Sequence, residues 1–252
     1  MSVYSIHFSP TGGTKKVMDC LNAAFGPVTE IDLSCRSEDF SRWHFTREDL
    51  CLVGMPVFGG RFPAIALERF AQLQADGTPC ALVAVYGNRA IDDALIELFD
   101  LARENGFVPV AGVEAVAKHS LFPQVATERP DAADIAQLKD FSAQILAAAR
   151  TPALAEIPGN RPYKPRKPNG FFPAPTENCT RCSYCAEVCP TGAIDLLDPA
   201  QVDPAKCIGC MRCVTQCPEA ARIRPPEKMA AAWERLAPVF AGHKPNRIYL
   251  AK

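Results

Sequence analysis

The chain has 252 residues, a formal net charge of −1, 48% hydrophobic residues and 22% charged residues. This composition is typical of a globular protein with one large or two modest domains. The balanced charge argues against general nucleic-acid binding, and no apolar run approaches the length needed to cross a bilayer. The N-terminal segment shows no secretory signal, so we expect a cytoplasmic protein without membrane insertion.

Before residue 151, short apolar runs alternate with segments of helical periodicity. This pattern predicts βαβ units, and therefore an α/β doubly wound parallel sheet with helices on both faces. The predicted helices lie near residues 14–25, 62–75, 91–105 and 131–149. The five predicted strands are Val3 to Phe8, Val28 to Leu33, Leu50 to Gly54, Cys80 to Tyr86 and Val108 to Val116. Between them, the long connection 34–49, with Trp43 and His44, has room for a helical turn.

A candidate phosphate-binding loop follows the first predicted strand. It reads Ser9-Pro10-Thr11-Gly12-Gly13-Thr14 and leads into a helix near Lys15. Glycines let the backbone approach a ligand closely, hydroxyls donate hydrogen bonds, and a helix N-terminus offers unpaired N–H groups. An ordinary strand-to-helix turn capped by a hydroxyl explains the same residues. Both interpretations stay open at this point.

Two further candidate loops follow the third and fourth predicted strands, at the carboxyl ends where open α/β sheets bind ligands. Their glycines suit tight turns whose backbone can face a flat ring, and Phe58, Phe62 or Tyr86 could stack on such a ring. The loops consist of Pro56, Val57, Phe58, Gly59, Gly60 and Arg61, and of Tyr86, Gly87, Asn88 and Arg89.

Residues 151–176 are rich in proline and carry a basic run, which predicts an extended linker. Solubility explains the basic residues better than the docking of an acidic partner does; they are Arg161, Lys164, Arg166 and Lys167. Residues 227–252 form a C-terminal helix and tail. The periodicity of Met229, Trp233, Leu236 and Phe240 predicts a helix that packs back on one of the domains.

Eight cysteines between residues 177 and 226 form two copies of one motif, C-x2-C-x2-C-x3-C-P. This is the spacing of bacterial two-cluster ferredoxins, so the sequence predicts two [4Fe–4S] clusters. Structural zinc needs only four ligands and leaves the fourth cysteine of each run unexplained, and disulfide frameworks belong to small secreted chains. The copies are Cys179, Cys182, Cys185 and Cys189 before Pro190, and Cys207, Cys210, Cys213 and Cys217 before Pro218.

The family pattern implies that the fourth cysteine of each run serves the other cluster. One cluster would then take Cys179, Cys182, Cys185 and Cys217, and the other Cys207, Cys210, Cys213 and Cys189. The remaining cysteines lack ligand spacing and are interpreted as core thiols; they are Cys20, Cys35, Cys51 and Cys80.

The first 150 residues resemble flavodoxins, whose phosphate loop S/T-x-T-G-x-T holds the phosphate of FMN. Ser9, Thr11, Gly12 and Thr14 match that pattern, and the two further loops correspond to the flavin-contacting loops of the family. Flavodoxins often place a tryptophan in these loops, and this chain has none there. As a whole, the chain resembles ferredoxins that carry a flavodoxin-like N-terminal region. The resemblance implies a small α+β ferredoxin-like domain after the flavodoxin-like one.

We therefore expect an electron-transfer protein with two [4Fe–4S] clusters, FMN and a redox protein as donor or acceptor. In that role no residue needs to act as an acid or base. Alternatively, a reductase would use His119, Arg61 or Arg89 to orient a small-molecule acceptor on the flavin. His119 is more simply a structural histidine, and the two arginines suit an anionic ligand or ion pairs equally. A third possibility is a ferredoxin whose first domain binds no flavin and serves for docking.

Overall fold

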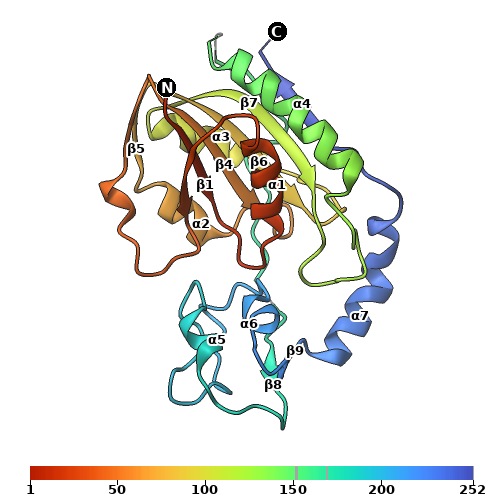
Figure 1. Ribbon diagram of the computed structural model, residues 1–252. Coiled ribbons are helices and arrows are strands. Elements are labelled where there is room, and N and C mark those ends of the chain that lie inside the picture. The colour runs from red at the N-terminus through yellow and green to blue at the C-terminus, as the bar shows by residue number, and fades with distance from the viewer. Residues whose placement is uncertain (151–152, 169, 252) are drawn as a thin grey trace.

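The computed structural model describes residues 1–150, 153–168 and 170–251. Its first part is a parallel sheet whose strands alternate with helices (Figure 1). In chain order the elements are β1 (Val3–His7), α1 (Gly13–Asn22), β2 (Val28–Asp32), η1 (Phe40–Arg42), β3 (His44–Thr46), β4 (Leu50–Pro56), α2 (Ala64–Phe70), β5 (Gln74–Asp76), β6 (Thr78–Tyr86), α3 (Ala94–Glu104), β7 (Phe107–Val116) and α4 (Ala132–Ala148).

The order of the strands defines the fold of this part. The main sheet runs β10-β7-β6-β4-β1-β2, and all pairs except the one with β10 are parallel. Numbered along the chain, the five parallel strands have the order 2-1-3-4-5, which is the flavodoxin-like order. The five predicted strands and four predicted helices are therefore confirmed, and the connection 34–49 contains the turn η1 and the short strand β3.

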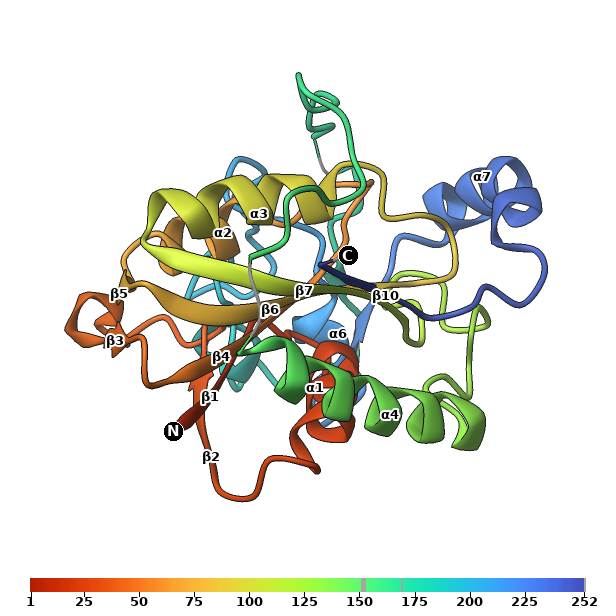
Figure 2. The ribbon, with the colours of Figure 1, turned by 90° about the horizontal axis from the view of Figure 1, so that it is seen from above.

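Helices cover both faces of the sheet (Figure 2). Helices α2 and α3 bury Phe70, Leu95 and Phe99 on one face, in the larger hydrophobic cluster. Helices α1 and α4 bury Met18 and Leu138 on the other. Because both faces are covered, the central strands are apolar throughout, as the continuous burial of β4 and β6 shows.

A small second domain holds both cysteine runs and lies at the carboxyl ends of the parallel strands (Figure 1). A two-stranded antiparallel ribbon, β8 with β9, ties its ends together. Among the described residues, no helix of the protein combines the length and apolar character that crossing a membrane requires. The remaining elements are β8 (Ala174–Pro175), α5 (Tyr184–Glu187), α6 (Arg212–Thr215), β9 (Arg222–Ile223), α7 (Pro226–Leu236), η2 (Ala237–Phe240) and β10 (Arg247–Leu250).

The C-terminal tail returns to the first domain and adds a sixth strand, which the sequence did not predict. Strand β10 pairs antiparallel with β7 along Ala111 to Glu114. Asn246, just before it, is 3% exposed; its side chain accepts from the Val116 N–H and donates to Asp134 and Gln137. The predicted C-terminal helix is confirmed as α7, and it packs on Phe122 of the first domain through Trp233.

The linker is attached to the first domain along the described residues 153–168. Leu154 and Ile157 are buried in the larger hydrophobic cluster. Its basic side chains pair with carboxylates at or just before α3: Arg161 with Asp100, Lys164 with Asp92 and Arg166 with Glu97. For these three residues, attachment to α3 replaces solubility as the explanation. Residues 151, 152 and 169 of the predicted linker and residue 252 of the predicted tail lie outside the described residues.

Replacing Asn246 by alanine should destabilise the protein by about 1–3 kcal/mol, because the buried Val116 N–H loses its acceptor. Urea unfolding of the anaerobic holoprotein, followed by far-UV circular dichroism, measures the change. His243→Gln in the same segment is the matched control, since His243 is exposed and such surface substitutions change stability by less than about 0.5 kcal/mol. Equal effects of the two substitutions would contradict this role of Asn246.

Candidate functional site

Two cavities in the second domain are each lined by four cysteines. The first, here called the outer cavity, is lined by Cys179, Cys182, Cys185 and Cys217. The second, here called the inner cavity, is lined by Cys189, Cys207, Cys210 and Cys213. Each cavity takes three cysteines from one run and the last cysteine from the other. The structure thus brings the eight cysteines together in the two sets that the ferredoxin resemblance implies.

The backbone of both runs follows the same path. Left-handed residues stand just before and just after the second cysteine of each run, at Arg181 and Ser183 in the first and at Gly209 and Met211 in the second. Except at glycine, each left-handed residue costs on the order of 1 kcal/mol. The recurrence of this conformation in both runs therefore indicates that the loop requires it. These turns wrap each loop around a common centre.

Local hydrogen bonds and burial suit these sulfur atoms to bound metal. The N–H four residues after the last cysteine donates to its sulfur in both runs, from Ala193 to Cys189 at 3.4 Å and from Ala221 to Cys217 at 3.3 Å. Burial raises the pKa of the Cys210 thiol to about 12. A free thiol there stays protonated, whereas a coordinated iron compensates the buried thiolate charge. The cavities therefore fit iron–sulfur clusters.

The inner cavity faces the first domain. Ile208, which lines it, packs against the larger hydrophobic cluster of that domain. Arg69 of α2 is 7% exposed and donates both to the Leu33 carbonyl after β2 and to the Pro190 carbonyl after Cys189, each at 2.6 Å. The sequence gives no sign of this role of Arg69, because its two acceptors are distant in sequence. By contrast, Cys182 of the outer cavity is exposed.

The loop from Ser9 to Thr14 keeps free donors for an anion. The Ser9 hydroxyl accepts from the Lys15 N–H at 2.8 Å, so it caps α1 as the turn interpretation requires. Among the described residues, the N–H groups of Thr11, Gly13 and Thr14 have no hydrogen-bond acceptor. Gly12 is left-handed, with no atom within 4 Å of the position a Cβ would take. This end of α1 therefore fits a phosphate.

The second candidate loop is a tight hairpin closed by Phe58 and Arg61, with Gly59 and Gly60 at positive φ. Of the three aromatic candidates for stacking, Phe62 is 1% exposed and Tyr86 is 5% exposed, and both belong to the core. Phe58, like Pro56 and Val57, is half-buried. Arg61 pairs with Glu97 and donates to the Lys164 carbonyl, so it positions the linker.

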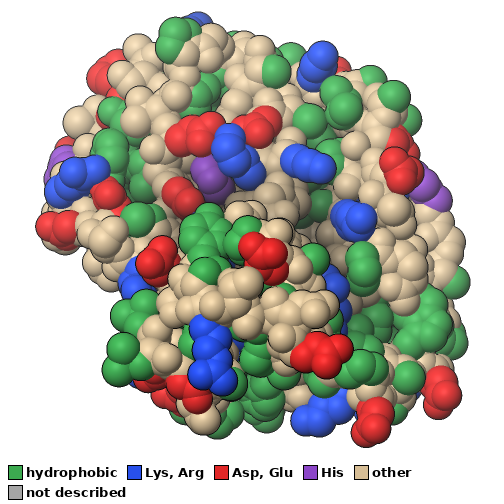
Figure 3. Space-filling model, turned by 60° about the horizontal axis from the view of Figure 1, so that its bottom comes forward, with side chains coloured by type: hydrophobic (Ala, Val, Ile, Leu, Met, Phe, Trp, Pro, Cys, Tyr) green, Lys and Arg blue, Asp and Glu red, His purple; other side chains and the backbone are tan. Residues whose placement is uncertain are grey.

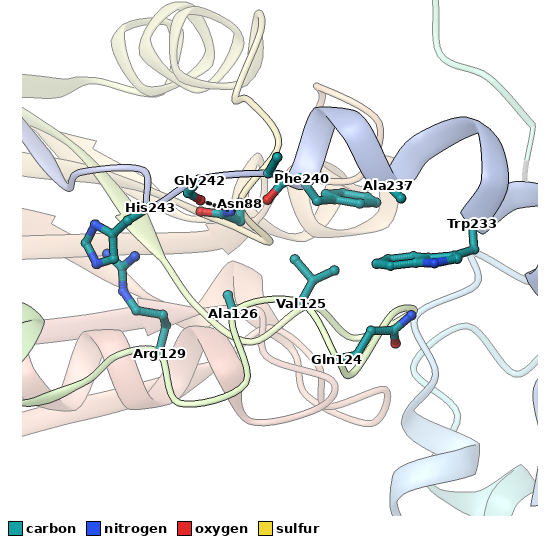
Figure 4. A pocket seen from close by; sticks show the side chains of 11 residues that line it. Asn88, Gln124, Val125, Ala126, Arg129, Trp233, Ala237, Phe240, Gly242 and His243 are labelled. Carbon is teal, nitrogen blue, oxygen red and sulfur yellow. Dashed lines mark hydrogen bonds between the residues drawn. The ribbon is translucent and has the colours of Figure 1, made fainter.

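The third candidate loop is tied to the C-terminal segment (Figure 4). The Asn88 amide donates to the Phe240 carbonyl at 2.6 Å and to the Gly242 carbonyl at 2.8 Å. A cavity of about 380 Å³ lies beside this contact, between Trp233 and Phe240 on one side and the loop around Val125 on the other. Of the three candidate loops, the third contributes to its lining, through Asn88. Gly87 packs on His119, and Arg89 pairs with Asp92 at 2.5 Å.

His119 is a structural residue. Its Nδ1 accepts hydrogen bonds from the N–H groups of Leu121, at 3.1 Å, and Phe122, at 3.3 Å. Phe122 and Phe240 meet the ring edge to face. Burial, followed by the charges of Arg224 and Arg89, lowers the pKa of His119 from 6.5 to about 4. Cys51 and Cys80 are buried core thiols, whereas Cys20 and Cys35 are half-buried.

Comparisons with known proteins found matches to the two parts of the chain separately. Residues 178–221 match the family model described as a 4Fe-4S dicluster domain. No curated protein matches the chain. Among solved structures, the Streptococcus pneumonia TIGR4 flavodoxin is 18% identical and has a TM-score of 0.43, with 58% of this chain and 99% of that chain covered.

Two further solved structures cover a similar part of the chain. Flavodoxin 2 from Bacillus cereus is 13% identical, with 58% of this chain and 99% of that chain covered and a TM-score of 0.43. The rubredoxin oxygen:oxidoreductase from Desulfovibrio gigas is 17% identical, with 59% and 36% covered and a TM-score of 0.42. Strand order, rather than these similarities, defines the first domain as flavodoxin-like. The family match defines the second as a ferredoxin-type 4Fe–4S domain.

The pKa of His119 predicts a pH dependence of stability. The unfolded chain binds a proton at this side chain below about pH 6.5, whereas the folded protein keeps it neutral down to about 4. The stability contributed by neutral His119 is therefore complete above that range and is lost as the pH falls through it. In His119→Gln, the free energy of unfolding should fall less steeply as the pH is lowered, because unfolding takes up fewer protons, by up to about one. Urea unfolding across this range measures both slopes; identical slopes would contradict the assignment.

Proposed function

We propose that this protein transfers electrons through two [4Fe–4S] clusters, one in each cysteine cavity. The observation that carries the proposal is the grouping of eight cysteines into two sets of four, each lining its own cavity. Four thiolates are what one such cluster needs at its corners. The family match to a dicluster domain supports the same assignment. The protein's contribution is to hold the thiolates, limit solvent access and supply hydrogen bonds to sulfur.

The two sets have different surroundings, which suggests different partners for the two clusters. The exposed Cys182 lets an external redox protein approach the outer set. Figure 3 shows the ferredoxin end of the molecule, where acidic and basic side chains are mixed with hydrophobic ones. This surface suits a docking protein better than a nucleic acid. The inner set faces the first domain through Ile208 and Pro190.

We further propose that the first domain binds FMN. The unpaired N–H groups of Thr11, Gly13 and Thr14 would hold its phosphate. The ring would lie near the hairpin of Gly59 and Gly60, where Phe58 is the accessible aromatic residue. FMN exchanges one or two electrons when bound, which would let the chain combine single electrons into a pair.

The alternatives differ in what the first domain does. For a reductase with its own small-molecule acceptor, the three candidate positioning residues are already engaged, because His119 accepts from two backbone N–H groups and Arg61 and Arg89 are paired within the chain. The docking alternative, in which the first domain binds no flavin, has support from the attachment of Asn88 to the C-terminal segment. Flavin binding decides between the docking role and the proposed one.

Iron and acid-labile sulfide, measured on anaerobically purified protein, should correspond to two four-iron clusters per chain. Cys217→Ala removes one thiolate from the outer cavity and should lower both contents by about half. Cys20→Ala is the control, since Cys20 lies on α1 away from both cavities, and should keep full iron. Bound zinc without sulfide in the unmodified protein would contradict the proposal.

The flavin-free protein should bind FMN at least about tenfold more tightly than riboflavin, because only FMN carries the phosphate that the loop receives. Thr11→Glu places a negative charge in that loop and should abolish most of this preference while leaving riboflavin binding unchanged. Quenching of flavin fluorescence measures each dissociation constant. Equal affinities would contradict the phosphate loop, and no binding of either flavin would favour the docking alternative.

A further inference from the structure

At three equivalent positions, the second cysteine run has an arginine where the first has a neutral residue. Counted from the cysteines, Tyr184 of the first run corresponds to Arg212 of the second, and Ile194 corresponds to Arg222. Leu196 corresponds to Arg224 in the same way. At all three positions, a neutral side chain in the first run is an arginine in the second. The first run has one arginine, Arg181, which is exposed, lines neither cavity and corresponds to Gly209, so the second run carries two more arginines than the first.

These three arginines share an unusual feature. Their Nε atoms are buried and have no hydrogen-bond partner. Within the described part of the chain, no carboxylate lies within ion-pair distance of any of them. Buried polar atoms normally find a partner, so unpaired N–H groups on a cation point to an anion at this place.

The positions of the arginines relative to the cavities are unequal. Arg222 is 3% exposed and lines both cavities. It is fixed by donating to the Pro199 carbonyl at 2.7 Å and to the Pro173 carbonyl at 3.0 Å, and its Nη1 lies 3.7 Å from the Cys185 sulfur. Arg212 lines the inner cavity but not the outer one. Arg224 lines neither cavity, and its Nη2 donates to the Ser120 carbonyl of the first domain at 2.8 Å.

The outer cavity has the opposite bias, because Glu219 lines it. A four-iron cluster with four thiolates is negative, and reduction adds one more negative charge. A nearby cation therefore favours the reduced form and raises the reduction potential, and a carboxylate lowers it. Burial of the inner cavity acts in the other direction. The arginines lie in the same low-dielectric surroundings, where their attraction to the cluster is strongest. Their effect on the reduction potential therefore outweighs the effect of burial.

We propose that Arg222 raises the reduction potentials of both clusters and that Arg212 raises that of the inner cluster alone, which makes the inner cluster the electron acceptor of the pair. This inference rests on the proposed function, since it requires both clusters. One electron, supplied by an external redox protein at the outer cluster, then moves to the inner cluster without any bond being made or broken. The arginines act through their positive charges, which direct electrons toward the first domain.

The test is an anaerobic redox titration of the holoprotein followed by electron paramagnetic resonance, which yields two midpoint potentials. The variants insert the residues of the first run: Arg212→Tyr and Arg222→Ile. Arg222→Ile should lower both potentials, Arg222→Lys should keep both near the original values, and Arg212→Tyr should lower only the higher potential. Arg235→Gln removes an exposed charge on α7 and should change neither. Iron and sulfide are measured on every sample.

The possible failures are distinguishable. Full iron with both potentials unchanged in Arg222→Ile would overturn the inference and leave the proposed function standing. A shift of the lower potential in Arg212→Tyr would overturn the assigned direction. Iron for fewer than two clusters in the unmodified protein would remove the proposed function and this inference with it. If Arg222→Ile loses iron, Arg222→Gln, which is neutral but keeps a donor for the proline carbonyls, gives the same comparison.

Discussion

The placement of the second domain depends on the return of the chain to the first. Strand β10 pairs with β7, and the buried Asn246 links this tail to Val116 and to Asp134 of α4. On the other side, the linker buries Leu154 and Ile157 in the core of the first domain. The ferredoxin domain is therefore held at both of its ends, and Arg69 bonds it to the sheet edge between them.

This double attachment gives the two cysteine cavities unequal surroundings although their loops repeat. The inner cavity contacts the first domain through Ile208, while the exposed Cys182 of the outer cavity leaves that set accessible. At the positions equivalent to Tyr184 and Ile194, the second run has arginines. The cavity that faces the first domain therefore also has the more positive surroundings. The proposed path of electrons, from the outer set to the inner set and on to the first domain, rests on both features together.

The sequence predicted the five parallel strands, because their apolar runs are long and separated by helical periodicity. The cysteine spacing defined the motif, and the ferredoxin pattern that it matches implied the grouping of the cysteines. Strand β10 escaped prediction because a four-residue strand gains its stability from β7, which lies far away in the sequence. The roles of Arg61 and Arg166 were equally inaccessible, because both pair with Glu97 only after folding. The burial of Phe62 and Tyr86, which leaves Phe58 as the more accessible candidate for stacking, could not be predicted because it depends on tertiary packing.

The central claim is that electrons pass between the clusters and the first domain within one chain. The most direct measurement is a brief photoreduction that gives each molecule less than one electron, followed by the absorbance of the flavin at several protein concentrations. Transfer within the chain predicts a first-order flavin reduction whose rate constant is independent of protein concentration. A rate that rises in proportion to concentration would mean transfer between molecules and would contradict the claim.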